Sequence, residues 1–159
     1  MSPRDNRRMG SDLLLKVELP SDPSMLCVVR GAMERLTETF GFSASEVRSV
    51  TRAVDEALTN IMRHSYGGKL DRRIELSCLR VSKQQRVPSG QGFEVRLVDY
   101  GPKIDPAKLR GRKLDEIKPG GLGLHFIRQS MDIVEFKRAR GTNVLRLVKY
   151  LQPEKREEN

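Results

Sequence analysis

The stretch between Ser43 and Gly68 carries the pattern that most restricts the fold of this chain. Its apolar residues recur every three or four positions, at Val47, Val50, Val54, Ala57, Leu58 and Ile61. This period predicts an amphipathic helix, which must bury one face against another layer of the protein. Ser43 followed by Glu46 is a capping-box pattern that marks the start of the helix, and Gly67-Gly68 marks its end.

The rest of the chain predicts further elements that pack around this helix. A second amphipathic helix is expected from Pro23 to Gly41, and a shorter one from about Gly123 to Met131. Apolar runs of strand length occur at 13–19, 73–81, 93–99, 133–137 and 143–150. This order predicts an α+β fold, a two-layer sandwich in which one sheet carries helices mainly on one face.

The length of the chain suits a single domain. Its 159 residues can bury a core, and 37% of them are hydrophobic before glycine is counted, which is normal for a globular protein. We expect residues 1–11 to form a disordered basic tail and residues 152–159 a charged C-terminal tail. Cys27 and Cys78 lie among apolar neighbours without metal-ligand spacing, so we expect buried thiols in a reducing compartment.

The formal charge of +9 admits nucleic acid, phosphates or acidic proteins as partners. Basic residues are interleaved with 21 acidic ones, and no aromatic–basic alternation suited to base stacking is present. These features disfavour direct nucleic-acid binding, a rival hypothesis that a steep fall of affinity with salt would reveal. No apolar run approaches the roughly 20 residues that span a bilayer, and the N-terminal dozen lacks the apolar stretch of a secretion signal. We therefore expect a cytoplasmic protein without a membrane partner.

An acid and an amide lie one helical turn apart on the polar face of the central helix. Glu56 and Asn60 share this face with Arg52 and His64. Taken alone, the pair would be explained more readily by a solvated polar stripe. A carboxamide oxygen also suits Mg²⁺ that already carries phosphate oxygens, and a carboxylate beside it could accept a proton from a hydroxyl.

Asp99 and Gly101 follow the apolar run 93–98, where the third strand is expected to end. An acid before Gly-Pro is often only a turn initiator. A carboxylate buried at a strand end can instead accept a hydrogen bond from the exocyclic amine of a purine. The absence of a side chain at Gly101 would let the base approach the backbone. Both adenine and guanine are chemically compatible with this arrangement.

A glycine-rich turn precedes the last predicted helix, at Gly120, Gly121, Leu122, Gly123 and Leu124. Its free N–H groups and the helix dipole favour an anion, although a flexible turn would also explain the glycines. No Gly-Lys-Ser/Thr follows, and the GxGxxG spacing is absent, so the turn is neither a P-loop nor a dinucleotide fingerprint. The many lysines and arginines between 103 and 118 could close over phosphates as a lid.

Taken in order, these segments resemble a known family. The strings from Glu56 to Tyr66, Asp99 to Asp105 and Gly120 to Asp132 are similar to the motifs of the anti-sigma factor serine/threonine kinases of bacterial partner-switching systems. This group belongs to the GHKL ATPase superfamily of gyrase B, Hsp90, histidine kinases and MutL. The string from Gly141 to Leu151 resembles the closing strand of the family, so the likeness spans roughly residues 12–151.

The resemblance implies a Bergerat-type fold with a mixed, mostly antiparallel sheet, and a histidine-kinase-like ATPase domain over residues 12–151. It implies that Asn60 holds Mg²⁺ and that Glu56 is the catalytic base. Arg63 and His64 lie near the phosphate-contacting positions of the family. Asp99 would bind adenine with help from Thr142, and Gly101 would line the pocket. Residues 120–124 would offer N–H groups to the phosphates of ATP.

The function implied is that of an ATP- and Mg²⁺-dependent protein-serine/threonine kinase. By the family pattern it would phosphorylate a STAS-domain antagonist, bind and inhibit a sigma factor or another effector, and form a homodimer. The alternative is a nucleotide-gated binding module of the same fold without phosphotransfer. The intact pair Glu56 and Asn60 favours the kinase, because a module that only binds has no need of both.

Overall fold

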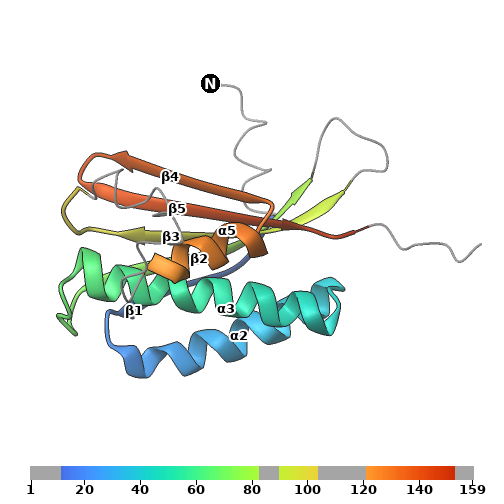
Figure 1. The fold of residues 1–159 in the computed structure, drawn as a ribbon, viewed down its shortest axis with the longest axis horizontal. Helices are drawn as coiled ribbons and strands as arrows, with labels where there is room; N and C mark the ends of the chain where they lie inside the picture. Colours follow the sequence, from blue (N-terminus) through green and yellow to red (C-terminus); the bar gives the residue numbers. More distant parts are fainter. Residues whose placement is uncertain (1–11, 83–89, 104–120, 153–159) are drawn as a thin grey trace, which may run out of the picture.

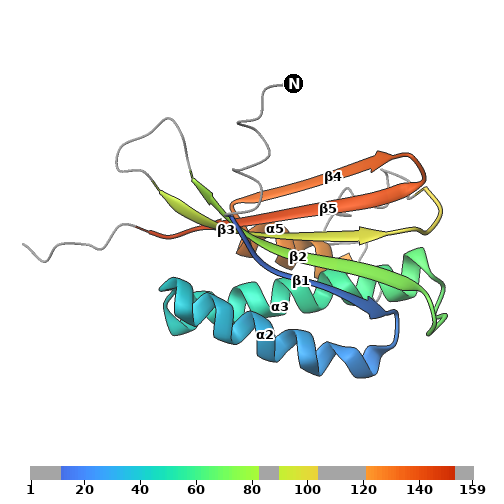
Figure 2. The ribbon, with the colours of Figure 1, turned by 180° about the vertical axis from the view of Figure 1, so that it is seen from behind.

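The computed structural model describes residues 12–82, 90–103 and 121–152. Within these residues a five-stranded sheet forms one layer, and helices cover one of its faces (Figure 1). The strands, in spatial order, are β1 Leu13–Pro20, β2 Arg73–Ser82, β3 Gln91–Asp99, β5 Thr142–Tyr150 and β4 Ile133–Ala139. The helical elements are η1 Pro23–Met25, α2 Leu26–Phe40, α3 Ala44–Asn60, η2 Ile61–Ser65 and α5 Gly121–Ser130. Seen from behind, α2 and α3 run side by side beneath the sheet (Figure 2).

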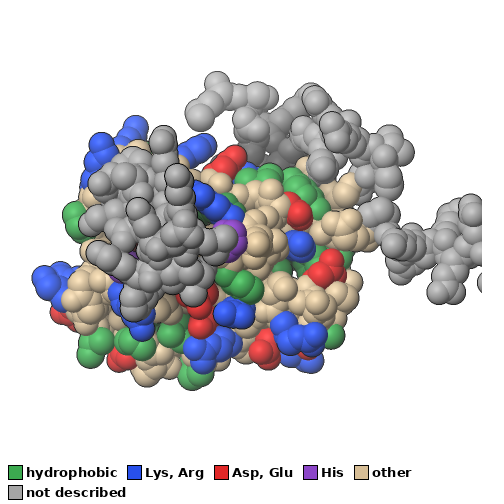
Figure 3. All heavy atoms as spheres, in the orientation of Figure 1, with side chains coloured by type: hydrophobic (Ala, Val, Ile, Leu, Met, Phe, Trp, Pro, Cys, Tyr) green, Lys and Arg blue, Asp and Glu red, His purple; other side chains and the backbone are tan. Residues whose placement is uncertain are grey.

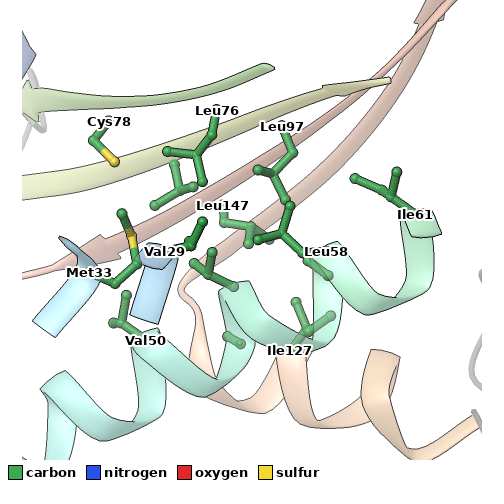
Figure 4. Packing of buried hydrophobic residues seen from close by; sticks show 14 of the residues in the cluster. Val29, Met33, Val50, Leu58, Ile61, Leu76, Cys78, Leu97, Ile127 and Leu147 are labelled. Atoms are coloured by element: carbon green, nitrogen blue, oxygen red, sulfur yellow. The ribbon is translucent and has the colours of Figure 1, made fainter. Parts of the chain in front are cut away.

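The core fills the space between the two layers. Leu76, Leu97 and Leu147 project from β2, β3 and β5 toward Leu58 of α3 and Ile127 of α5 (Figure 4). Side chains of a strand alternate between its two faces, so one residue in two along these strands enters the core. This layer of apolar contacts fixes α3 and α5 on the sheet and thereby positions their polar faces.

Local signals in the sequence define the ends of the helices. At the start of α3 the capping box is complete: the Ser43 Oγ accepts from the Glu46 N–H at 3.2 Å, and the Glu46 carboxylate accepts from the Ser43 N–H at 2.8 Å. Gly41 ends α2 with a φ of 105°, a left-handed conformation that a side chain would disfavour. These caps confirm the boundary at 41–43 that the sequence predicts.

The predicted fold class is confirmed, and the structure refines it. Among the described strands every pairing is antiparallel, so this part of the sheet contains no parallel pair. A π-helical turn, η2, extends α3, which the apolar period does not predict. The predicted N-terminal tail, residues 153–159 of the C-terminal tail and the basic segment 104–120 lie outside the described residues.

The prediction that both cysteines are buried is wrong for one of them. Cys78 faces the core from β2, and burial raises the pKa of its thiol to about 12. Cys27 is exposed on α2, because the apolar face of that helix runs through Leu26, Val29 and Met33 and leaves position 27 outside it. No helix of the described residues is long and apolar enough to cross a membrane.

Candidate nucleotide site

The acid and the amide of α3 meet the glycine-rich start of α5. A Cβ placed on Gly123 would lie 2.7 Å from the Glu56 Oε2 and 3.8 Å from the Asn60 Nδ2. The first contact is shorter than real Cβ contacts, so any side chain at position 123 would force the Glu56 carboxylate to move. The glycine turn and the Glu56–Asn60 pair, which are far apart in the sequence, therefore form one site.

Glu56 and Asn60 are half-buried, and neither side chain makes a hydrogen bond or ion pair with a described residue. Arg52, one turn earlier, does not pair with Glu56. Its guanidinium instead lies over the Phe126 ring of α5, 4.2 Å from the ring centroid. The interaction ties α5 to α3 next to the acid and leaves the carboxylate available to a ligand.

The π-turn η2 redirects the chain directly after Asn60. Its closing bond runs from the Tyr66 N–H to the Ile61 carbonyl at 3.0 Å, a span of five residues. The turn carries Ser65 to the end of β3, where its hydroxyl reaches Asp99. Ser65 is buried, whereas Arg63 and His64 are exposed on the same turn.

Asp99, 2% exposed at the end of β3, is the centre of a buried hydrogen-bond network. Its Oδ1 accepts three hydrogen bonds, from the Ser65 Oγ at 2.5 Å, the Gly101 N–H at 2.9 Å and the Asn143 Nδ2 at 2.9 Å. No described residue donates to its Oδ2. The donors come from η2, from the turn after β3 and from β5, so the tertiary fold fixes the orientation of this carboxylate.

Asn143 pairs directly with Asp99 in the register between β3 and β5. Besides Asp99, its Nδ2 donates to the Pro102 carbonyl at 3.1 Å, and its Oδ1 accepts from the Arg138 Nη1 at 2.9 Å. The same Arg138 nitrogen donates to the Gly101 carbonyl at 2.9 Å. Asn143 and Arg138 together hold the turn that follows Asp99.

Gly101 has to be glycine for a steric reason. A Cβ there would overlap the Ser65 hydroxyl and would lie 2.8 Å from the Ser65 carbonyl oxygen. The absence of a side chain thus lets the turn after β3 approach η2 closely enough for Ser65 to reach Asp99.

The structure places the remaining expected residues as follows. Thr142 lies at the start of β5, where its hydroxyl donates to the Ala139 carbonyl at 2.7 Å, and its neighbour Asn143 contacts Asp99 in its place. Gly121 and Leu122 form the first turn of α5, and Leu124 is half-buried one turn into it. Gly120 lies outside the described residues.

Sequence reasoning missed three residues of this site, namely Ser65, Arg138 and Asn143. The signal for Asn143 was available, because strand alternation from Leu145 and Leu147 puts position 143 on the buried face opposite Asp99. The spacing of Ser65, four residues after Ile61 and seven after Leu58, also puts it on the buried face of the helix, but nothing local names its partner Asp99, 34 residues away. Arg138 is an exposed residue of β4, and its sequence context indicates only a solvated cation.

A metal ion at this site would depend on the nucleotide. Among the described residues no three His, Cys, Asp or Glu side chains group to hold a metal by themselves. The Asn60 carboxamide supplies one hard oxygen ligand, and Mg²⁺ bound to a nucleotide commonly takes one or two protein ligands besides phosphates and water. The donor set therefore fits Mg²⁺ that arrives with a triphosphate.

A family model described as a histidine kinase-like ATPase domain matches residues 19–149 of the chain. The chain belongs to this ATPase family. It is 28% identical over 146 residues to the serine-protein kinase RsbW of Listeria monocytogenes, a match that covers 91% of this chain and 92% of that protein. The resemblance drawn from the motifs is thus confirmed for the ATPase family.

Two solved structures share the fold. The SiaB–SiaC complex from Pseudomonas aeruginosa aligns with a TM-score of 0.57 and 14% identity, over 95% of this chain and 99% of that chain. The RsbU and RsbW domains of a Mycobacterium tuberculosis protein align with a TM-score of 0.57 and 12% identity, over 88% of this chain and 34% of that one. At these identities the likeness supports the fold alone.

Proposed function

We propose that this protein is an ATP-dependent protein-serine/threonine kinase of the partner-switching type. The observation that carries the proposal is the contact of Gly123 with Glu56 and Asn60, which joins the two catalytic motifs into one site. η2 continues α3 from this site to Asp99, so one helix links the acid and amide to the buried carboxylate. The similarity to proteins named serine-protein kinase supports the same activity.

Each group of the site has a chemical task under this proposal. ATP with Mg²⁺ would supply the transferable phosphoryl group. The Asn60 carboxamide would hold the cation, and the backbone N–H groups of Gly121, Leu122 and Gly123 would bind phosphate oxygens at the start of α5. The Oδ2 of Asp99 would accept a hydrogen bond from the exocyclic amine of adenine.

Glu56 would act as the base. Its carboxylate has no hydrogen-bond partner among the described residues, so an incoming serine or threonine hydroxyl can give its proton to it. A base positioned in this way contributes about 10²–10⁴-fold to the rate. The greater part of the acceleration would come from positioning the two reactants and neutralising the phosphate charge.

The proposed partners are proteins. A STAS-domain antagonist would be the phosphate acceptor, and a sigma factor or another effector would be bound and inhibited in the cytoplasm, with the kinase acting as a homodimer. The charge of +9 suits acidic partners. Figure 3 shows lysine and arginine side chains spread over the visible face with acidic side chains between them, an arrangement unlike a continuous track for nucleic acid.

The test combines the purified protein, labelled ATP, Mg²⁺ and the STAS-type protein encoded nearest to its gene. We expect phosphoserine or phosphothreonine on the antagonist. Glu56→Gln should reduce transfer by about 10²–10⁴-fold while ATP still binds. Arg48→Ala, on an exposed position of the same helix, serves as the matched control and should leave transfer unchanged.

Three results would contradict the kinase function or the role assigned to Glu56. ATP binding without any transfer to the antagonist would favour a nucleotide-gated binding module. Equal transfer by the wild type and Glu56→Gln would remove the assigned role of Glu56. Binding of DNA or RNA that weakens steeply with added salt would support the nucleic-acid hypothesis instead.

A further inference from the structure

Building on the nucleotide-binding function proposed above, we propose that Ser65 and Asn143 determine purine specificity. By occupying the Oδ1 of Asp99 they leave this carboxylate a single acceptor, the Oδ2, for the base. A single acceptor suits adenine, which offers one amine, and disfavours guanine, which offers two neighbouring donors. The choice between adenine and guanine, which Asp99 alone leaves open, is thus made by two residues that contact Asp99.

The first step is the saturation of Oδ1. An ionised carboxylate has about four lone-pair positions, two on each oxygen. Ser65, Gly101 and Asn143 place three donors on Oδ1, at 2.5, 2.9 and 2.9 Å. A donor on a nucleotide base therefore finds no further place on this oxygen.

The second step is that the carboxylate is held in this orientation, so that one of its two equivalent oxygens always faces the three donors. Ser65 is held in the π-turn η2, and Asn143 is held by the Pro102 carbonyl and by Arg138. Rotation of the carboxylate would break three hydrogen bonds at a position that is 2% exposed. Unpaired donors at a buried site are costly, so the observed orientation is strongly preferred.

The third step concerns Oδ2, which has no donor among the described residues. Because no described residue donates to Oδ2, the lone pairs of this oxygen remain for a donor on a ligand. It is the acceptor that the protein leaves to a ligand.

The last step is the chemistry of the bases. Adenine carries a 6-amino donor beside the N1 acceptor, whereas guanine carries the N1–H and 2-amino donors side by side. Two parallel donors match a carboxylate that presents both oxygens. With Oδ1 occupied, the second donor of guanine would be buried without an acceptor, and sites reject ligands that leave buried polar groups unpaired.

The experiment measures the affinities of ATP, ITP and GTP by calorimetry with Mg²⁺, on the full chain. Hypoxanthine in ITP has the N1–H of guanine but lacks its 2-amino group, so the ratio of GTP to ITP affinity reports the second acceptor alone. For the wild type we expect ATP to bind about tenfold or more tighter than ITP, and GTP to bind no tighter than ITP.

The test variant is Ser65→Ala combined with Asn143→Ala, which removes two of the three donors from Oδ1. The freed oxygen should then pair with the 2-amino group, and the ratio of GTP to ITP affinity should rise about tenfold. Ser65→Ala alone should raise the ratio of GTP to ITP affinity about threefold. This single variant replaces the double variant as the test if the double variant does not fold. Thr39→Ala is the control, because its hydroxyl bonds only within α2, to the Arg35 carbonyl, and the ratio should not change.

The outcomes separate this proposal from the kinase function. If Ser65 and Asn143 had only a structural role, the variants would bind all three nucleotides more weakly by the same factor. An unchanged ratio of GTP to ITP affinity in the variants would therefore overturn the specificity proposal, whereas ATP binding by the wild type would still support the nucleotide site. A wild type that binds GTP more tightly than ITP would overturn it as well. A wild type that binds none of the nucleotides would overturn both proposals.

Discussion

The two ends of the site differ in how fully the protein satisfies its own polar groups. Around Asp99 every described donor has an acceptor, and Oδ2 is the one carboxylate oxygen left over. At Glu56 and Asn60, by contrast, neither side chain bonds to a described residue. Under the proposed function, the Asp99 end would be a preformed recognition element, whereas the Glu56 end would keep its acceptors free for a ligand that brings donors and a cation.

This difference follows from what each end has to do. Recognition of a base gains from groups that are already in place, because no ordering cost is incurred on binding. Proton transfer needs a carboxylate that is not engaged by a permanent donor. A mutation should therefore act mainly on stability and specificity at the Asp99 end, and mainly on rate at the Glu56 end.

The strongest test of this contrast is Gly123→Ala. The new Cβ would fall 2.7 Å from the Glu56 Oε2, which is the far end of a flexible side chain, so the carboxylate must move while the fold persists. We expect phosphotransfer to fall about 10²-fold, as for other small displacements of a reacting group, with little change in the urea midpoint. Gly31→Ala, where a Cβ meets open space on α2, is the control and should not slow transfer.

Asn143→Ala should sharpen the contrast from the opposite end. It removes one of the two acceptors of the Arg138 Nη1 and the side-chain donor to the Pro102 carbonyl and to the Asp99 Oδ1. We expect the free energy of unfolding in urea to fall by about 1–3 kcal/mol. Thr142→Ala removes a single hydrogen bond at the exposed turn between β4 and β5. This substitution should change the free energy of unfolding by less than about 0.5 kcal/mol. Equal effects of the two substitutions would show that the Asp99 network contributes no special stability.

Arg52→Ala tests how α5 is held beside the acid. It removes the cation–π contact with Phe126 and should destabilise the protein by about 0.5–1 kcal/mol, the range for exposed contacts of this kind. The loss should be concentrated in α5, where amide hydrogen exchange should speed up more than in α2. Uniform acceleration across all helices would contradict a local role for Arg52.

The smallest effect is expected at the cysteines, which lie outside both ends of the site. The thiol of Cys78 stays protonated below its pKa of about 12 and is covered by the core, while Cys27 is exposed. Iodoacetamide at pH 8 should modify Cys27 alone in the folded protein and both residues in urea. Mass spectrometry of the peptides measures the extent of modification at each cysteine. Modification of Cys78 under native conditions would indicate frequent opening of the core.

Much of the site could be predicted because its residues carry local signals. Glu56 and Asn60 are recognisable from their spacing of one helical turn, Asp99 from its place at the end of an apolar run, and Gly123 from the glycine-rich turn. The exposure of Cys27 was missed, because apolar sequence neighbours do not show which side of a helix a residue occupies. Ser65 was missed because its partner Asp99 lies 34 residues away, and a serine on a buried face carries no local signal of such a contact.

The sequence by itself determined the elements, their caps and the two-layer class, and it named the polar residues that we propose for a nucleotide site, because these depend on periodicity and on side-chain chemistry over short spans. Only the tertiary structure decided that Gly123 touches Glu56 and that Ser65 and Asn143 share one oxygen of Asp99. These contacts join residues 34 to 67 positions apart, as the pairs 65–99, 99–143 and 56–123 show. Strand register, helix docking and a single π-turn set such distances, and no local pattern encodes them.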